Sequence, residues 1–548
     1  MTTAWKYGTW FMLLVASFSA LASEPAIEEA VRAEIEYLRE SGKLSLGEFE
    51  IASGELLARV YEGRNFTPAW SGTGRIDELA QLIEATAADG LDPADYYLGE
   101  IRRVRAMLAN GRRFDTAERA AIDIGLTDSL IRLGYHQRFG KVNPNDLDPE
   151  WNFTRELRNG DTALVIQEAL ESESLTAYVE SLFPRAELYR QLQRSLAAYR
   201  ELAAAGGWPV VPSGPTLRPG DRDGRLEVLA RRLAVTSDLP AGSVVDTQVY
   251  GGLLETAVRN FQARHGLFMD GIVGPATVRA LNVTVEQRID QIRVNLERAR
   301  WVLDDLEDDF VIVNIAGFRV YLYRGRKEIW SARAVVGKTY RKTPVFRSTM
   351  QYLVFNPDWT VPYSIATSDI LPAVQRDPGY LAAGNFIVKD RDGDVVDPAA
   401  IDWSALRAGN FPYTLVQRPG RNNALGEIKF MFPNEHAVYL HDTPGKGLFD
   451  RAARTFSSGC VRVEYPFEFA ELLLEANGMD AAAIEKLRSG RQTRSVFLEQ
   501  PIPVLLLYWT AEVGQDGRIH FYEDIYERDG PLLEALDSAY AVELADAA

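Results

Sequence analysis

The sequence contains one cysteine, Cys460, in the segment FSSGCVRV. A thiol attacks as its thiolate, and an unperturbed cysteine with a pKa of about 8.5 is mostly protonated at neutral pH. A histidine within hydrogen-bond reach can take that proton and later give it to a leaving group. His441, in the preceding stretch HAVYLHD, is the candidate base. The pair indicates nucleophilic catalysis. The alternative is that Cys460 is only a small buried apolar residue.

The backbone around the cysteine also suits a nucleophile. Gly459 lets the backbone approach a substrate closely, and the consecutive N–H groups of Gly459 and Cys460 can face an oxyanion. The following segment, YPFEFAELLLEANG, predicts a helix that starts at Pro466 and ends at Gly478. The start of a helix close to Cys460 would favour negative charge there.

The stretch HAVYLHD alternates as a strand does, so Tyr439 and His441 are expected to point the same way. If the strand is unbroken, His436 has the opposite parity and points elsewhere. Asp442 also alternates to the other face, so a backbone carbonyl is the better candidate for holding the imidazole of His441.

Metal binding is the rival use of cysteine and histidine. The sequence has one cysteine, five histidines and no close ligand pair such as CxxC or HExxH, which argues against a structural zinc site. The net charge of -17 argues against a nucleic-acid groove, which needs a basic stripe. It argues equally against docking on anionic lipid.

The N-terminus has the pattern of a secretory signal peptide over residues 1–22. Lys6 gives a short basic region, residues 10–18 are apolar, and Ala20-Leu21-Ala22 is a cleavage motif. The apolar run is shorter than the roughly 20 residues that a membrane span needs. We therefore expect cleavage after Ala22, and the alternative is an uncleaved inner-membrane anchor.

Two helical regions are expected to precede the catalytic segment. Residues 23–205 have helical periodicity, and their first helix places Ile27, Val31, Ile35 and Leu38 on one face, so we expect an α-helical scaffold domain. The lone His136 is expected to be a packed or surface residue. A Gly- and Pro-rich stretch, 206–224, marks a boundary.

Residues 213–285 predict a small helical module. Its main helix has a buried stripe of Leu254, Ala257, Val258 and Phe261, and Pro275 starts a second short helix. At AVRNFQARHGLFMDGIVGPATVRALN the module resembles the peptidoglycan-binding repeat-type domain. The resemblance does not establish that this copy binds glycan.

The remainder predicts a mostly β catalytic domain, 306–500, after a linking helix, 286–305. A polar insertion, 364–424, lies next to the strands of the site and is a candidate lid. We expect a loop at 486–497, and C-terminal strands and a tail over 501–548. The whole is a multidomain α+β protein.

The site motif, His441 followed by Ser457-Ser458-Gly459-Cys460-Val461-Arg462, resembles the signature of the L,D-transpeptidase catalytic (YkuD-type) domain. The family motif is a histidine and then S-x-G-C-x-R. The resemblance makes Cys460 the nucleophile and His441 the proton donor and acceptor. We expect Gly459, Ser458, Arg462 and Tyr439 at the oxyanion and substrate positions. Ser458 stands where many members have histidine.

The chain resembles the large periplasmic YcbB-like branch of this family in its domain order and in the segment NNALGEIKFMFPNEHAVYLHDTP. This implies a periplasmic enzyme that forms 3-3 crosslinks between a tetrapeptide donor and a diaminopimelate acceptor of peptidoglycan. It implies no metal or organic cofactor, and other cell-wall enzymes are candidate partners. The alternatives are water or a lipoprotein lysine as acceptor, or a non-catalytic wall-binding scaffold.

Overall fold

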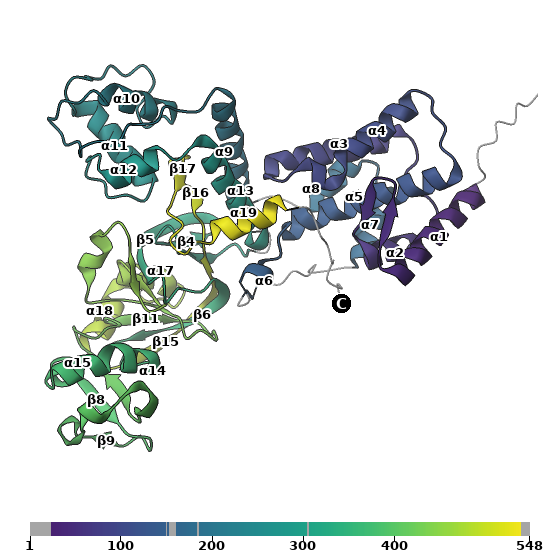
Figure 1. Cartoon of the computed structure of the whole chain (residues 1–548). Coiled ribbons are helices and arrows are strands. Elements are labelled where there is room, and N and C mark those ends of the chain that lie inside the picture. The colour runs from purple at the N-terminus through teal and green to yellow at the C-terminus, as the bar shows by residue number, and fades with distance from the viewer. Residues whose placement is uncertain (1–23, 149–150, 153–160, 183–185, 304–305, 539–548) are drawn as a thin grey trace, which may run out of the picture.

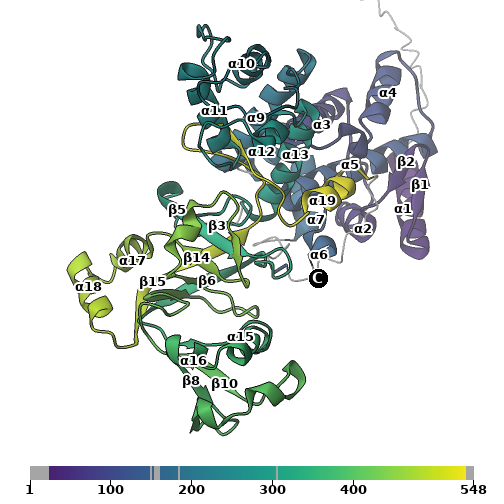
Figure 2. The same ribbon diagram turned by 60° about the vertical axis from the view of Figure 1, so that its left-hand side comes forward.

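The computed structural model describes residues 24–148, 151–152, 161–182, 186–303 and 306–538 (Figure 1). The predicted signal peptide, 1–22, lies outside these residues. The chain forms a helical scaffold lobe, a second small helical lobe and a β-rich lobe. The two helices α9 (Glu187–Ala204) and α13 (Val285–Val302) lie between the lobes, and the turned view of Figure 2 shows the same arrangement.

The scaffold lobe is helical, as the periodicity predicts. On its first helix the predicted face of Ile27, Val31, Ile35 and Leu38 is buried. His136 is fully buried against the Tyr96 hydroxyl, at 2.9 Å, so it is a packed histidine as expected. The elements are α1 (Glu24–Ser41), β1 (Leu44–Leu46), β2 (Phe49–Ile51), α2 (Gly54–Gly63), α3 (Thr73–Ala85), η1 (Thr86–Asp89), η2 (Pro93–Tyr96), α4 (Leu98–Ala109), α5 (Thr116–Phe139), α6 (Pro144–Leu147), α7 (Thr162–Glu171), α8 (Leu175–Leu182) and α9 (Glu187–Ala204).

The second lobe consists of α10 (Leu226–Val235), α11 (Gly252–Arg264) and α12 (Pro275–Leu281) around one core. The predicted stripe on α11, from Leu254 to Phe261, is buried, and Pro275 is the first residue of α12 as predicted. The linking helix is α13 (Val285–Val302), which begins with a capping box between Thr284 and Gln287.

The β-rich lobe is built on one nine-stranded sheet that closes on itself. Its order is β13-β5-β14-β12-β11-β6-β15-β3-β4, and β4 pairs again with β5. The long strand β5 makes this closure, because its first part pairs with β4 and its last part pairs with β14 and β13. The strands are β3 (Phe310–Asn314), β4 (Arg319–Arg324), β5 (Lys327–Gly337), β6 (Phe346–Phe355), β11 (Ile428–Met431), β12 (Leu440–His441), β13 (Thr455–Ser457), β14 (Val461–Val463) and β15 (Arg494–Leu507).

Strand β15 differs from the expectation of a loop at 486–497. It begins at Arg494, lies between β6 and β3, and bends at an irregularity between Phe497 and Ile502. The boundary placed at residue 500 therefore falls inside a strand of the catalytic sheet. The interrupted alternation at this bend hides the first half of the strand in the sequence.

Short helices and a hairpin complete this lobe. The helix predicted after Cys460 is α17 (Pro466–Leu474), followed by α18 (Ala481–Ser489), while η7 (Lys446–Asp450) lies between His441 and Cys460. Beyond β15, β16 (Ala511–Val513) pairs with β17 (Ile519–Phe521), as expected for the tail. The last helix, α19 (Asp529–Asp537), returns to the scaffold core through Leu532 and Leu536.

The candidate lid is a separate small body at the end of the β-rich lobe farthest from α10–α12 (Figures 1 and 2). It has its own sheet, β7-β10-β8-β9, and its own apolar core. Its sheet begins at Trp359, earlier than the predicted 364. The elements are β7 (Trp359–Thr360), α14 (Tyr363–Ile365), the π-helix η3 (Ala366–Ile370), α15 (Leu371–Arg376), α16 (Tyr380–Ala383), β8 (Phe386–Lys389), β9 (Val395–Val396), η4 (Pro398–Ala400), η5 (Trp403–Ala405), η6 (Ala408–Asn410) and β10 (Thr414–Gln417).

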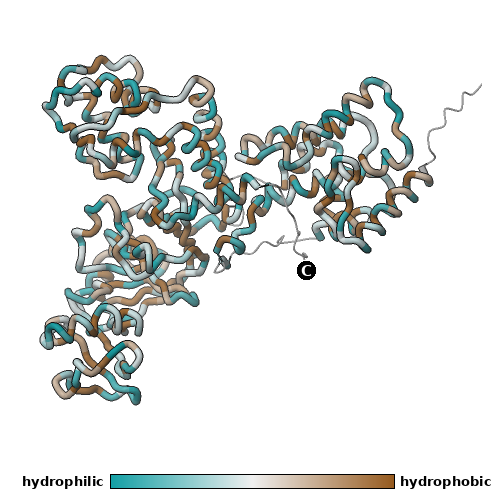
Figure 3. Tube along the Cα trace, in the orientation of Figure 1, coloured by the Kyte–Doolittle hydropathy of each residue, from teal (hydrophilic) through white to brown (hydrophobic). Residues whose placement is uncertain are grey.

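Apolar and polar segments interchange along every lobe in Figure 3, so none of the lobes is apolar as a whole. Within the described part of the chain, no helix has the length and apolar character needed to cross a membrane.

Candidate active site

Three neighbouring strands bring the candidate residues to one face of the catalytic sheet. His441 on β12 pairs with Arg462 on β14 and with Lys429 on β11. Because paired residues project to the same side of a sheet, the three side chains form one row across it. Their strand neighbours Leu440, Phe430 and Val461 point into the core and are fully buried. The alternation of apolar residues thus fixes which face carries the row.

His441 is buried, and a backbone carbonyl fixes its ring. Its Nδ1 lies 2.5 Å from the carbonyl oxygen of Asp442. A carbonyl only accepts, so Nδ1 carries the proton and Nε2 keeps its lone pair. Burial, with Arg462 as the next cause, lowers the pKa of His441 to about 3. The imidazole is therefore neutral at physiological pH and able to accept a proton.

Asp442 does not serve His441 through its carboxylate. One oxygen accepts from the Glu427 amide at 2.9 Å, and the other accepts from Lys446 Nζ. The expectation that a carbonyl, and not this side chain, contacts the imidazole agrees with this geometry.

Cys460 follows β13 and immediately precedes β14, with its thiol beside Tyr439. The amide of the next residue, Val461, donates to the Tyr439 carbonyl at 3.1 Å, which holds this part of the loop against the β12 segment. Burial raises the pKa of the Cys460 thiol, while Tyr439, Arg462 and Lys429 act in the opposite direction. The resting pair is therefore a neutral thiol and a neutral imidazole.

The strand predicted over HAVYLHD is much shorter than expected. Only Leu440 and His441 are in β12, residues 435–436 form a turn, and Ala437 has a φ of 53°. The parity argument therefore cannot be extended to His436, whose ring instead packs on Phe346 with centroids 5.0 Å apart. Tyr439 and His441 do lie on one side, with ring centroids 5.7 Å apart.

The nucleophile loop is braced from a distant part of the chain. Thr343 Oγ1 donates to the Gly459 carbonyl at 2.8 Å and accepts from the Gly337 amide at 2.9 Å. The Tyr526 hydroxyl donates to the Gly337 carbonyl at 2.6 Å and accepts from the Thr343 amide at 3.1 Å. Gly459 itself has a φ of 120°, which a residue with a side chain rarely adopts.

The oxyanion donors differ from the expected pair of amides. The Gly459 N–H is already donated to Ser457 Oγ at 3.2 Å, and Ser457 Oγ in turn donates to the Cys460 carbonyl at 2.5 Å. The Cys460 N–H has no hydrogen-bond acceptor among the residues that the structure describes. Of the two amides, the amide of Cys460 is thus the one free to bind an oxyanion.

Ser458 connects the nucleophile loop to the candidate lid. Arg341 Nη1 donates to Ser458 Oγ at 3.0 Å and to Asp369 Oδ2, on the π-helix η3, at 2.6 Å. At the base of the lid, buried Asn423 donates to the carbonyls of Pro357, Gln417 and Arg418. It thereby joins the segment that precedes β7 to the segment that follows β10.

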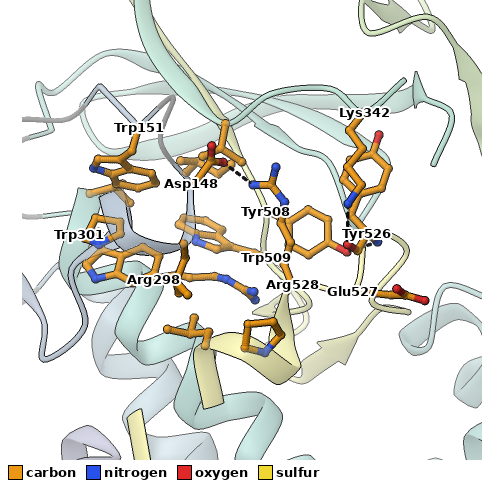
Figure 4. A pocket seen from close by; sticks show the side chains of 17 residues that line it. Asp148, Trp151, Arg298, Trp301, Lys342, Tyr508, Trp509, Tyr526, Glu527 and Arg528 are labelled. Carbon is orange, nitrogen blue, oxygen red and sulfur yellow. Dashed lines mark hydrogen bonds and ion pairs between the residues drawn. The ribbon is translucent and has the colours of Figure 1, made fainter. Parts of the chain in front are cut away.

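A cavity of about 260 Å³ lies behind the nucleophile loop, between α6, α13, β15 and the C-terminal segment (Figure 4). Its lining is rich in aromatic residues, and two of its arginines are paired, Arg298 with Asp529 at 2.6 Å and Arg528 with Asp148 at 2.8 Å. Lys342 Nζ donates to the Tyr526 carbonyl at 3.0 Å on its wall. Neither Cys460 nor His441 lines it, whereas Tyr526, which contacts Thr343, does.

Sequence reasoning missed Lys429, Arg341 and Tyr526. Lys429 had a usable signal, since it interrupts the apolar run EIKFMF between two core residues. Tyr526 had none, because its contact with Thr343 joins residues far apart in the chain. Among the described residues, no group of three or more His, Cys, Asp or Glu is arranged to hold a metal ion.

Comparison with known proteins finds similarity along most of the chain. Residues 308–484 match the family model of the L,D-transpeptidase catalytic domain. Residues 231–281 match a "Putative peptidoglycan binding domain", and residues 55–196 match a "Scaffold domain". A relative from Haemophilus influenzae named "Putative L,D-transpeptidase" is 27% identical over 522 residues, 94% of this chain and 88% of the relative.

Two further similarities are partial. The N-acetylmuramoyl-L-alanine amidase CwlM of Mycobacterium tuberculosis is 39% identical over 75 residues, 12% of this chain and 18% of that protein. Crystal structures of L,D-transpeptidases from Xylanimonas cellulosilytica and Stackebrandtia nassauensis are 16% and 13% identical, with TM-scores of 0.18 and 0.21. Each covers 54% of this chain and nearly all of the solved chain, 99% and 97%. The family assignment rests on the sequence matches.

Proposed function

Since the chain is an L,D-transpeptidase that carries a peptidoglycan-binding domain, we propose that it forms 3-3 crosslinks in peptidoglycan through an acyl-enzyme on Cys460. The donor is a tetrapeptide stem, and its scissile bond joins diaminopimelate to the terminal D-Ala. The observation that carries the proposal is the neutral imidazole of His441, fixed at Nδ1 by the Asp442 carbonyl and in register with Arg462, two residues after Cys460.

In the first half-reaction Cys460 Sγ attacks the diaminopimelate carbonyl carbon while His441 Nε2 takes the thiol proton. Because burial disfavours both a thiolate and an imidazolium at rest, the proton moves with the attack. The Cys460 N–H binds the oxyanion. The C–N bond then breaks, His441 returns the proton to the departing D-Ala amine, and a thioester remains.

In the second half-reaction the side-chain amine of another diaminopimelate attacks the thioester. His441 takes a proton from this amine and gives it to the leaving thiolate, which restores the enzyme. Water competes for the same thioester, and the lid is proposed to screen it and to hold the acceptor. The contacts of Arg341 with Asp369 and Ser458 support a lid that reaches the nucleophile loop.

The test is incubation of the purified protein with a disaccharide-tetrapeptide, followed by mass spectrometry of the products. We expect a crosslinked dimer and one released D-Ala per crosslink. Tripeptide as the only product would make water the acceptor, and transfer only to a lipoprotein lysine would make the chain a tethering enzyme. Either result would contradict crosslinking. Export to the periplasm, with a signal peptide at 1–22, belongs to the same proposal and is tested by cell fractionation.

A further inference from the structure

Lys429 is a cation at the reaction centre to which the proposed mechanism gives no task. It lies on β11, and its register partner is His441. The opposite neighbour of His441 is Arg462 on β14. The row therefore reads Arg462, His441, Lys429, with Cys460 at the Arg462 end, two residues before it on the same chain segment.

The ammonium of Lys429 has no anionic partner in the described structure. Its Nζ lies 5.5 Å from the centroid of the Tyr439 ring, and neither a hydrogen bond nor an ion pair within 4 Å joins it to a carboxylate of a described residue. Burial lowers the pKa of Lys429, while the exposed Asp358 and, when it is ionised, Cys460 act in the opposite direction. A half-buried cation without a counter-ion is costly, so the site is suited to an anion brought by a ligand.

The chemistry of the leaving group supplies such an anion. In a tetrapeptide donor, the nitrogen that His441 protonates belongs to the terminal D-Ala, whose carboxylate is bonded to the same Cα. Two backbone bonds put the carboxylate carbon about 2.5 Å from that nitrogen. Neighbouring strands lie about 4.8 Å apart. A cation one strand away from His441 is therefore within reach of this carboxylate.

The order of the row decides which of the two cations is involved. The acyl part of the donor stays bound to Cys460, at the Arg462 end of the row. His441 receives a proton from the thiol and passes it to the leaving nitrogen, so this nitrogen lies within reach of both groups. The donor chain continues through the reacting carbon, so the D-Ala extends away from the acyl part, past His441. That side is occupied by Lys429.

We propose that Lys429 binds the free C-terminal carboxylate of the leaving D-Ala and so selects donor stems that end at this residue. The inference rests on the proposed function. It makes Lys429 a specificity residue, because a pentapeptide has an amide bond where the tetrapeptide has its carboxylate. An ammonium that pairs well with a carboxylate gains little from a neutral amide.

The test compares two donors that differ only at this group: a disaccharide-tetrapeptide with a free C-terminus and the same molecule as its C-terminal amide. The readout is the single-turnover rate of acylation of Cys460, followed by intact-protein mass, which needs no acceptor. The variants are Lys429→Met, which keeps the aliphatic stem, and Lys486→Met, an exposed lysine of α18, as the matched control.

We expect the wild type and Lys486→Met to acylate with the acid at least tenfold faster than with the amide. Lys429→Met should lose this preference, because its reaction with the acid slows far more than its reaction with the amide. A preserved preference in Lys429→Met would overturn the proposal. An equal loss with both donors would also overturn it, because Lys429 would then act on the thiol or the imidazole. Failure of both donors to acylate the wild type would instead overturn the proposed function, and this inference with it.

Discussion

At the scale of single residues, the site is a pair of groups whose surroundings keep both neutral. Burial lowers the pKa of His441 to about 3 and raises the pKa of Cys460. A pre-formed thiolate–imidazolium pair would need the opposite shifts. The fixed Nδ1 proton and the free Cys460 amide prepare proton transfer and oxyanion binding, so the charge appears only as the bond forms.

This ionisation state predicts the pH dependence of Cys460 alkylation by iodoacetamide. The thiolate is the reactive form, and a raised pKa leaves the thiol protonated at pH 7. The ordinary pKa of a cysteine is about 8.5. Because the pKa of Cys460 is raised, the alkylation rate should keep rising through and beyond that pH. A plateau reached below pH 7 would instead indicate an ion pair with His441, and Cys460→Ala serves as the blank.

Thr343 is expected to act by positioning the nucleophile loop. Thr343→Val keeps the shape but leaves the Gly459 carbonyl and the Gly337 amide without their hydroxyl partner. A misplaced nucleophile can cost on the order of 10²-fold in rate. We expect a loss of that order in kcat, with KM for the donor nearly unchanged. Thr343→Ser retains the hydroxyl and should recover most of the rate. Equal activity in both variants would contradict the bracing role.

The site residues that could be predicted from the sequence are reactive side chains that lie in a recognisable local pattern. Cys460, Gly459 and His441 lie within or next to recognisable segments. Strand alternation indicates a backbone carbonyl as the partner of the His441 ring, and the structure identifies it as that of Asp442. The reasoning about His436 rested on an unbroken strand, which the turn before Ala437 interrupts. The bracing of Gly459 by Thr343 and Tyr526 could not be predicted, since it depends on tertiary contacts between distant segments.

At the scale of elements, the catalytic sheet positions the site and the lid is attached beside it. The lid leaves the sheet after β6 and returns just before β11, the strand that carries Lys429. Its insertion was visible in the sequence as a long polar stretch, whereas its start at β7 was not, because a strand of two residues has no periodic pattern. The same limit applies to β15. Its bend between Phe497 and Ile502 interrupts the alternation, so the sequence predicts a loop followed by a shorter strand.

The contact between lid and nucleophile loop leads to an element-scale prediction. Asp369→Asn removes the carboxylate that Arg341 pairs with at 2.6 Å, while the contact of Arg341 with Ser458 remains. The lid should then close less often over the thioester, so the ratio of crosslinked dimer to hydrolysed tripeptide should fall several-fold. Product analysis by mass spectrometry measures it, with Asp394→Asn, an exposed aspartate of the same lid, as control. An unchanged ratio would remove this pair from the mechanism.

At the scale of the whole molecule, the small helical lobe of α10–α12 is fixed to the β16–β17 hairpin by a buried charge cluster. Asp238 is 1% exposed and accepts from Arg264 at 2.6 and 2.9 Å and from Arg518 at 2.7 Å. Next to it, His265 stacks on Phe521 with ring centroids 5.8 Å apart. The lobe is therefore held at a set orientation relative to the catalytic sheet.

Asp238→Asn should loosen this connection. It leaves two arginines without their carboxylate, and removing one partner of a buried ion pair costs about 3–5 kcal/mol. We expect a lower thermal midpoint and faster amide exchange in α10, α11 and the hairpin, without slower acylation by a soluble donor. Asp246→Asn, at an exposed position of the same lobe, is the control. Unchanged exchange in the hairpin would contradict the docking role.

The proposed acyl-enzyme can be observed as a change in the intact mass of the protein after rapid mixing with a disaccharide-tetrapeptide and acid quench. We expect an adduct equal to the donor minus one alanine, located on Cys460. The adduct should be absent in Cys460→Ala, slower by orders of magnitude in His441→Ala, and formed at the wild-type rate in His436→Ala. An adduct or crosslinked dimer at wild-type yield in Cys460→Ala, or an inactive His436→Ala beside a normal His441→Ala, would contradict the proposed mechanism.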